Sequence, residues 1–376
     1  MKKTIGMILL LVLFVLLAGV VVIRSRNAAP AEADRSAFSG ETAERAPEPS
    51  ENAEGASVET ETHAVEVPEE EEPEPEPEPV WTPPPLREPE MVENSIPEEL
   101  LKPAEHKGTV TEVQYSTRDR VSELPDEVLK DAVVYLPYGY DPESRYDVLI
   151  LLHCAWEDHR FWLIQDRNYG TEAEPMPVSV PNFLDRMIET GYCEPMIVVS
   201  PCVYLYDRQP SAAGNGYDYM QFAREFGPDF LSFLAENYAT YATDGSREAL
   251  SEAREHFGVL GASFGAYASY ISVIVDNFDL VAWYTYCGGG AIDPGYLLNG
   301  WAEHGTSELP LKMLYICEGE HDDRAAPELS FHNLLYIGDP FSEENVKFTL
   351  VTGWGHEDHS YLVGVYNSLQ LFFRET

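Results

Sequence analysis

The stretch GASFG at 261–265 has the Gly-x-Ser-x-Gly spacing that can make a serine a nucleophile. An apolar run, HFGVLGA at 256–262, precedes Ser263, and a helix is expected to begin directly after it. Such a strand-to-helix turn crowds the backbone, so it needs small neighbours and leaves the serine Oγ above the carboxyl edge of the sheet. The N–H of Phe264 would then point at the oxyanion formed during attack on a carbonyl.

A serine hydroxyl is a weak nucleophile unless a histidine, oriented by an acid, accepts its proton. The bare motif arises by chance in about one chain of this length in ten, so these partners carry the prediction. The chain places an acid and then a histidine after the serine, each following an expected strand. Asp322 in CEGEHDD is the expected acid, with Asp323 and Glu320 as alternatives. His356 in TGWGHEDHSY is the expected base, with His359 as the alternative.

A second oxyanion donor is expected in the turn after an early central strand. LILLHCAWED at 149–158 fits this position, and the backbone N–H of Cys154 or Ala155 is the candidate. Cys154 does not lie at a strand-to-helix elbow, so we favour Ser263 over it as the nucleophile. Aromatic side chains near these loops could stack on an aryl or sugar ring, although half or more are expected to pack in the core. Trp156 and Trp354 are the candidate substrate-binding residues; Phe161, Trp162 and Tyr361 lie nearby.

Strand-like and helix-like segments alternate through residues 106–376, which predicts one α/β domain with a mostly parallel sheet covered on both faces. The continuous apolar run at 147–153 is typical of a strand buried on both sides. The other expected strands are 109–116, 131–137, 195–200, 256–262, 280–286, 311–317 and 345–352, and the expected helices are 180–190, 225–239, 326–337, 360–373 and one after Ser263.

These landmarks resemble the esterase D and feruloyl esterase-like group of α/β-hydrolases, which includes carbohydrate esterase family 1 and the enterochelin esterases. The segments that carry the resemblance occur in order over about 108–376: VVYLPYGYDPESRYDVLILLHCAWED, PNFLDRMIETGYCEPMIVVSP, GASFGA, CEGEHDD and GWGHEDHSY. The resemblance implies an α/β-hydrolase fold, Ser263 as nucleophile, His356 as base and Asp322 as acid. It also implies that Phe264 and either Cys154 or Ala155 form the oxyanion hole. The group usually has Gly at the position of Cys154 and often at that of Ala266, so the geometry of the oxyanion loop is expected to differ.

The N-terminus, MKKTIGMILLLVLFVLLAGVVVIRSR at 1–26, has about twenty uncharged residues between basic ends. This run is longer than the apolar core of a cleaved signal peptide and long enough to span a bilayer. We therefore favour a signal anchor with the C-terminal domain outside, and a cleaved signal peptide, which would release the protein, is the alternative. Residues 27–105 are rich in Pro and Glu and predict an extended linker without a fold of its own.

The chain carries 24 Lys and Arg against 65 Asp and Glu, a net charge of −41. We therefore expect no nucleic-acid partner, because two polyanions repel each other. The five cysteines, at 154, 193, 202, 287 and 317, show no metal-ligand spacing, and the sequence leaves a Cys193–Cys202 bridge open. We expect no metal and no organic cofactor.

The sequence thus predicts an extracytoplasmic serine carboxylesterase, with feruloyl or acetyl groups on plant polysaccharide as the favoured substrate. A catalytically silent surface binding protein on a hydrolase scaffold is the alternative from another class, because a fold alone does not imply activity. Acyl transfer to a glycan instead of water is a third hypothesis. The sequence leaves the oligomeric state open.

Overall fold

A computed structural model describes residues 81–206, 211, 214–304, 309–324 and 326–374. The predicted membrane anchor at 1–26 and the linker up to residue 80 lie outside the described residues. None of the helices within the described part is long and apolar enough to cross a membrane.

Eight strands of the described chain form one sheet, in the order β1-β2-β6-β3-β7-β8-β9-β10. Neighbours from β6 to β10 run parallel, whereas β1 and β2 pair antiparallel with each other and β2 with β6. This confirms the expected mostly parallel sheet. The bounds are β1 Thr109–Arg118, β2 Glu127–Leu136, β3 Val148–Leu152, β6 Ile197–Pro201, β7 Phe257–Ala262, β8 Trp283–Cys287, β9 Met313–Gly319 and β10 Val346–Val351. A separate two-stranded sheet pairs β4 Arg167–Asn168 with β5 Pro177–Val178.

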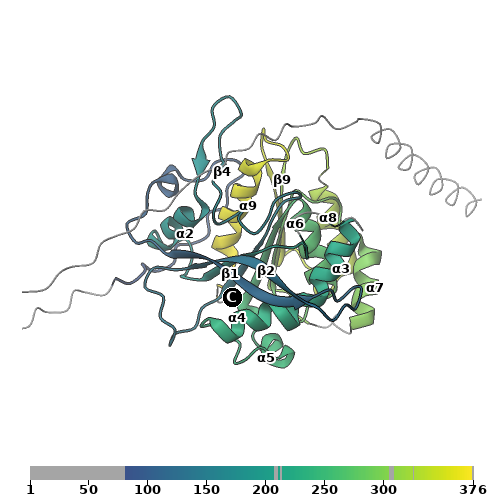
Figure 1. The fold of residues 1–376 in the computed structure, drawn as a ribbon. Helices are drawn as coiled ribbons and strands as arrows, with labels where there is room; N and C mark the ends of the chain where they lie inside the picture. Colours follow the sequence, from purple (N-terminus) through teal and green to yellow (C-terminus); the bar gives the residue numbers. More distant parts are fainter. Residues whose placement is uncertain (1–80, 207–210, 212–213, 305–308, 325, 375–376) are drawn as a thin grey trace, which may run out of the picture. The chain divides into compact units, whose positions relative to one another are not determined.

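Helices cover both faces of the sheet (Figure 1). On one face lie α2 Val180–Glu189 and α9 Asp358–Leu371. The other face carries α3 Asn215–Glu225, η2 Phe226–Leu231, α4 Ser232–Asn237, α5 Arg247–Glu252, α6 Phe264–Ala268, η4 Ser269–Val275, α7 Pro294–His304 and α8 Pro327–Ile337. The short 3-10 helices are η1 Glu98–Leu101 and η3 Arg254–His256.

Alternation along the central strands divides the core into two clusters, one on each face of the sheet. In β3, Leu149 and Leu151 join the cluster under α2 and α9, while Ile150 and Leu152 join the cluster under α3, α6 and α7. Successive strand residues point to opposite faces, and all five residues of β3 are buried. The continuous apolar run therefore stabilises the domain from both sides, as the sequence predicts.

The expected helix at 225–239 is part of a longer path through α3, η2 and α4. The middle piece has π-helical hydrogen bonding and contains Pro228. Proline has no N–H for the usual i to i−4 bond, and a π-turn is one way a helix accommodates that loss.

Residues 81–105, expected to belong to the linker, instead pack against the domain as a strap. Ile96 and Leu100 are buried. The backbone N–H of Val92 donates to Asn367 Oδ1 at 2.9 Å, and that of Glu90 donates to Gln370 Oε1 at 2.8 Å. Both acceptors lie on α9, so the folded unit begins before the expected boundary at residue 106. A few anchoring residues outweigh the local Pro/Glu composition.

All five cysteines are free thiols. Cys193 belongs to the cluster under α2 and α9, and Cys202 to the cluster on the other face of the sheet. The sheet separates the two, which excludes the bridge that the sequence leaves open.

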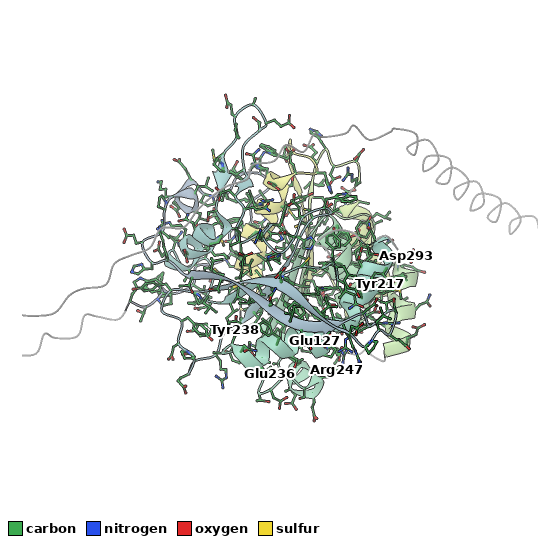
Figure 2. The ribbon with its side chains drawn as sticks, viewed as in Figure 1. Glu127, Tyr217, Glu236, Tyr238, Arg247 and Asp293 are labelled. Carbon is green, nitrogen blue, oxygen red and sulfur yellow. The ribbon has the colours of Figure 1, made fainter. Side chains whose placement is uncertain are left out.

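Arg247, labelled in Figure 2, is the first residue of α5 and links this helix to the segment before β8. It donates to both carboxylate oxygens of Asp279 at 2.9 and 2.6 Å, and Asp279 lies shortly before β8. Asp293, also labelled, accepts the N–H of Tyr296 at 2.7 Å and so begins α7.

Candidate active site

Ser263 lies in a sharp turn between β7 and α6, where its φ and ψ are 55° and −113°. This is a sparsely populated backbone region for a residue with a side chain. A Cβ on Gly261 would collide with the carbonyl of Gly265, and a Cβ on Gly265 would collide with the carbonyl oxygen of Leu152. The Ser263 N–H donates to Cys287 O at 2.8 Å. The two glycines are thus required by close packing around the serine.

The structure brings Ser263, His356 and Asp322 into one hydrogen-bonded line. Ser263 Oγ lies 2.9 Å from His356 Nε2, and His356 Nδ1 lies 2.6 Å from Asp322 Oδ2. The carboxylate accepts from Nδ1–H, which leaves Nε2 free to accept the serine proton. Asp322 is 9 % exposed, and its second oxygen accepts the Arg324 N–H at 2.9 Å. The arrangement can activate a serine and stabilise the imidazolium that results.

The alternative acids and the alternative histidine take no part in this hydrogen-bonded line. Asp323 and Glu320 are exposed, and Glu320 Oε2 accepts the N–H of Gly353 at 2.9 Å. His359 is buried, and its two ring nitrogens lie 2.6 and 2.8 Å from the carbonyl oxygens of Tyr169 and Asn94. It joins the strap to the domain, away from the serine hydrogen bond.

The three residues meet because they follow parallel strands. Ser263 follows β7, Asp322 follows β9 and His356 follows β10, so all three leave the same edge of the sheet. Loops at the carboxyl ends of parallel strands are where α/β proteins gather functional groups.

The oxyanion candidates flank this line. Phe264 is the first residue of α6, where backbone N–H groups lack a partner within the helix. Cys154 and Ala155 begin a turn after β3, and β3 neighbours β7 in the sheet. The turn is closed by a hydrogen bond from the Glu157 N–H to Cys154 O at 3.3 Å. Burial raises the pKa of the Cys154 thiol well above its usual range, so this thiol is a poor nucleophile.

His153 contacts both Cys154 and Phe264, two of the oxyanion candidates, and the sequence analysis did not identify it. Its Nε2 accepts the Val203 N–H at 2.9 Å, which leaves Nδ1 protonated to donate to Cys154 O at 2.8 Å. Its ring stacks on that of Phe264, with centroids 6.1 Å apart. Complete burial lowers the pKa of His153 to about 4, so the ring is neutral near pH 7. A polar residue at the end of a buried run was the available signal.

A buried ion pair supports the same segment from below. Lys130 Nζ contacts Glu225 Oε1 and donates to Val203 O at 3.3 Å. Both side chains are almost fully buried. Because the Val203 N–H donates to His153, Lys130 holds the carbonyl of the same residue that orients the histidine.

The segment after β8 packs closely against His356 and is held by a hydrogen bond to Glu318. A Cβ on Gly288 would lie 3.2 Å from His356 Cε1, and the φ of this glycine is 63°. The next N–H, of Gly289, donates to Glu318 Oε1 at 3.2 Å. Burial raises the pKa of Glu318 to about 10, so the acid is neutral near pH 7. It therefore adds no second negative charge beside Asp322.

Most of the aromatic candidates belong to the core. Phe161, Trp162 and Tyr361 are all buried. Trp354 is half-buried, and one face of its ring is covered by His359, with centroids 3.6 Å apart and planes 4° apart. Trp156 differs, because 76 % of it is exposed.

The described residues contain no group of three or more His, Cys, Asp or Glu that could hold a metal ion.

The fold and this site define an α/β-hydrolase architecture with a serine, histidine and aspartate in hydrogen-bonding order. Solved structures of feruloyl esterases have the same fold. A mutant of the feruloyl esterase module from Clostridium thermocellum, complexed with sinapinate, matches with a TM-score of 0.59 and 22 % identity, over 78 % of this chain and 97 % of that one. The CE1 ferulic acid esterase from Anaeromyces mucronatus matches with a TM-score of 0.57 and 18 % identity, over 76 % and 98 %. The resemblance read from the sequence is confirmed at the level of the fold.

Among curated proteins, the chain is similar to endo-1,4-beta-xylanase Y of Acetivibrio thermocellus, with 26 % identity over 296 residues. The match covers 74 % of this chain but only 24 % of that protein, so this chain corresponds to about a quarter of the relative's length. No family model matches the chain.

Proposed function

We propose that the chain is a serine carboxylesterase that works through an acyl-enzyme. His356 takes the proton of Ser263 as the serine oxygen attacks the ester carbonyl. The imidazolium then gives that proton to the departing alcohol. Water, deprotonated by the same histidine, releases the acid and restores the serine. Asp322 holds the imidazole in the required tautomer, and the backbone N–H groups of Phe264 and of Cys154 or Ala155 stabilise the oxyanion.

The observation that carries this proposal is the pair of hydrogen bonds, at 2.9 and 2.6 Å, that joins Ser263, His356 and Asp322 at one edge of the sheet. The strained backbone at Ser263 supports it, because strain of this kind gathers at functional sites. A silent binding protein would have no need of either feature.

We propose feruloyl or acetyl esters of plant polysaccharide as the substrate. Feruloyl esterase structures share the fold, and the curated relative carries the name of a xylanase. The net charge of −41 favours a neutral polymer over an anionic one.

A fluorophosphonate probe tests the chemistry directly, because it labels only an activated serine. We expect labelling of the wild type and of Ser232→Ala, a control on α4, and none of Ser263→Ala. Labelling that persists in Ser263→Ala, or its absence in the wild type, contradicts the proposal. Hydrolysis of methyl ferulate, acetylated xylan and p-nitrophenyl acetate then separates the acyl groups. Product analysis with an added alcohol distinguishes hydrolysis from acyl transfer.

We also propose that the domain acts outside the cytoplasm, tethered to the membrane by residues 1–26. The support is the apolar run between basic ends. Protease added to intact cells is expected to remove the domain and leave a short membrane-bound fragment. Full protection, or recovery of the activity in the cytoplasmic fraction, contradicts this location, and recovery in the medium favours a cleaved signal peptide.

A further inference from the structure

Trp156, a residue of the candidate oxyanion turn, has two unusual properties. Its side chain lies largely in solvent, with 76 % of the residue exposed. By contrast, Trp162, Trp283 and Trp301 are at most 3 % exposed. Tryptophan normally buries most of its large apolar surface. An isolated exposed aromatic residue would need no explanation, but this one directly follows Ala155.

The backbone of Trp156 is also in an unfavourable conformation. Its φ is 68°, a value at which glycine is strongly preferred. Trp156 is the third residue of the turn closed by Glu157 and Cys154, the position where type II turns take glycine. Its N–H donates to the hydroxyl of Tyr204 at 3.0 Å, which holds the turn in place. Tryptophan, the largest side chain, therefore occupies a backbone conformation that favours glycine.

Packing within the domain does not explain this choice. The ring of Trp156 takes part in none of the aromatic pairs formed among the described residues. The exposed ring and the strained backbone both cost stability, and natural proteins accept such costs where function requires them. Strain at a residue that directly follows a candidate oxyanion donor is a reason to look for a ligand contact.

We propose that the Trp156 indole, which belongs to the candidate oxyanion turn, is a stacking platform for a ring of the substrate. This inference rests on the proposed esterase function and adds a specificity-determining residue to it. An indole face accepts either a planar aryl ring or the apolar face of a sugar. The neighbouring carboxylates of Glu157 and Asp158 favour a neutral ring over an anionic one. Trp354 is less suited, because His359 already covers one face of its ring.

The test compares Trp156→Gly and Trp156→Phe with the wild type on three esters. Methyl ferulate offers an aryl ring without a sugar, acetylated xylo-oligosaccharide offers sugars without an aryl ring, and methyl acetate offers neither. In Trp156→Gly we expect KM to rise roughly tenfold for the ester whose ring stacks. Methyl acetate has no ring to stack, so its kcat/KM should fall clearly less than that of the ring-bearing ester and measures the effect of the turn alone. Trp156→Phe keeps an aromatic face and should restore most of the affinity. Tyr336→Ala, which removes an 87 % exposed tyrosine on α8, is the control and should change none of these values.

Thermal unfolding supplies a readout that does not depend on activity. Glycine relieves the strain at φ 68°, so Trp156→Gly is expected to unfold about 2–4 °C higher than the wild type. A purely structural tryptophan would give the opposite result, a lower unfolding temperature. Reduced affinity for a ring-bearing ester together with unchanged or higher stability supports the platform.

Two outcomes overturn the platform while leaving the esterase proposal intact. In one, all three esters keep their KM values in Trp156→Gly. In the other, all three lose activity equally, which would show that the turn matters and the ring does not. If the wild type hydrolyses no ester, the esterase proposal itself fails. Calorimetric titration of Ser263→Ala and of the Ser263→Ala, Trp156→Gly double variant with ferulate methyl ester and xylo-oligosaccharide then decides the platform separately. Weaker binding by the double variant supports the platform, and equal or absent binding overturns it.

Discussion

Two turns at the same edge of the sheet hold a side chain at positive φ, and they are stabilised in different ways. Ser263, at φ 55°, is enclosed between two glycines whose missing Cβ atoms leave room for the carbonyls of Gly265 and Leu152. Trp156, at φ 68°, is solvent-exposed and held by single hydrogen bonds to Tyr204 and across its own turn. The comparison suggests that the nucleophile is fixed by close packing of the backbone. The second turn is fixed by polar contacts that can be removed one at a time.

Replacing the serine is expected to have the largest effect. Both Ser263→Ala and Ser263→Gly should lower kcat by about 10⁴-fold or more, because the remaining groups have no nucleophile to activate. The glycine variant should be about 1 kcal/mol more stable than the alanine variant, since glycine tolerates φ 55°. Ester hydrolysis and urea unfolding measure the two effects. Equal stability of the two variants would show that the elbow is not strained.

Gly265→Ala tests whether the elbow depends on close packing. The added Cβ would collide with Leu152 O, so the free energy of unfolding should fall by about 3 kcal/mol and most of the activity should be lost. Gly216→Ala in α3 is the control, because a Cβ there has nothing within 4 Å. A Gly265→Ala variant with normal stability and kcat would refute this account of the turn.

The stability of the protein should decrease in acid because of His153, which donates to the turn that begins at Cys154. Its pKa of about 4 in the folded protein lies below the ordinary value of 6.5. Between these values the unfolded chain binds a proton that the folded one does not, so stability falls as the pH falls. The contribution lost at pH 4 is about 3 kcal/mol. Unfolding measured from pH 7 to pH 4 should show a smaller loss in His153→Gln than in the wild type. The control is His332→Gln, on the exposed surface of α8. Parallel curves for His153→Gln and wild type would contradict the prediction.

Tyr204→Phe is expected to give the smallest change and to separate the two turns. Losing the hydroxyl that accepts the Trp156 N–H should cost about 1 kcal/mol of stability. KM for a ring-bearing ester should rise a few-fold, while the rate of Ser263 labelling by a fluorophosphonate stays within about twofold. A labelling rate that falls as much as the affinity would mean that the two turns are coupled.

The sequence predicts the frame of the domain well, because the central strands are marked by their own apolar runs. The run at 147–153 appears as β3, that at 256–262 as β7 and that at 311–317 as β9 with shifted ends. The helix Pro294–His304 is absent from the prediction, since its residues show no clear apolar period. The strap at 81–105 was also missed, because its partners Asn367, Gln370 and His359 are far away in the sequence.

For the candidate site, the sequence predicts the residues that follow strands but not those that orient them. Ser263, Asp322 and His356 could be named because a known motif gives their order and each follows an expected strand. The link from His153 to Val203 joins segments fifty positions apart, and Lys130 reaches Val203 from yet another strand. Such contacts exist only after the sheet has formed. The unfavourable φ of Trp156 likewise has no signature in residue type.

The separation of the free thiols has a practical consequence. Burial raises the pKa of the Cys202 thiol to about 11, and that of the Cys193 thiol also lies above its ordinary value. Thiolate is the form that reacts, so both are slow to alkylate in the native protein and fast once exposed. Cys193 and Cys202 lie in the core clusters on opposite faces of the sheet. The alkylation rate of each thiol would therefore measure how often the helices on its own face open. No added label is needed, because both thiols are native to the chain.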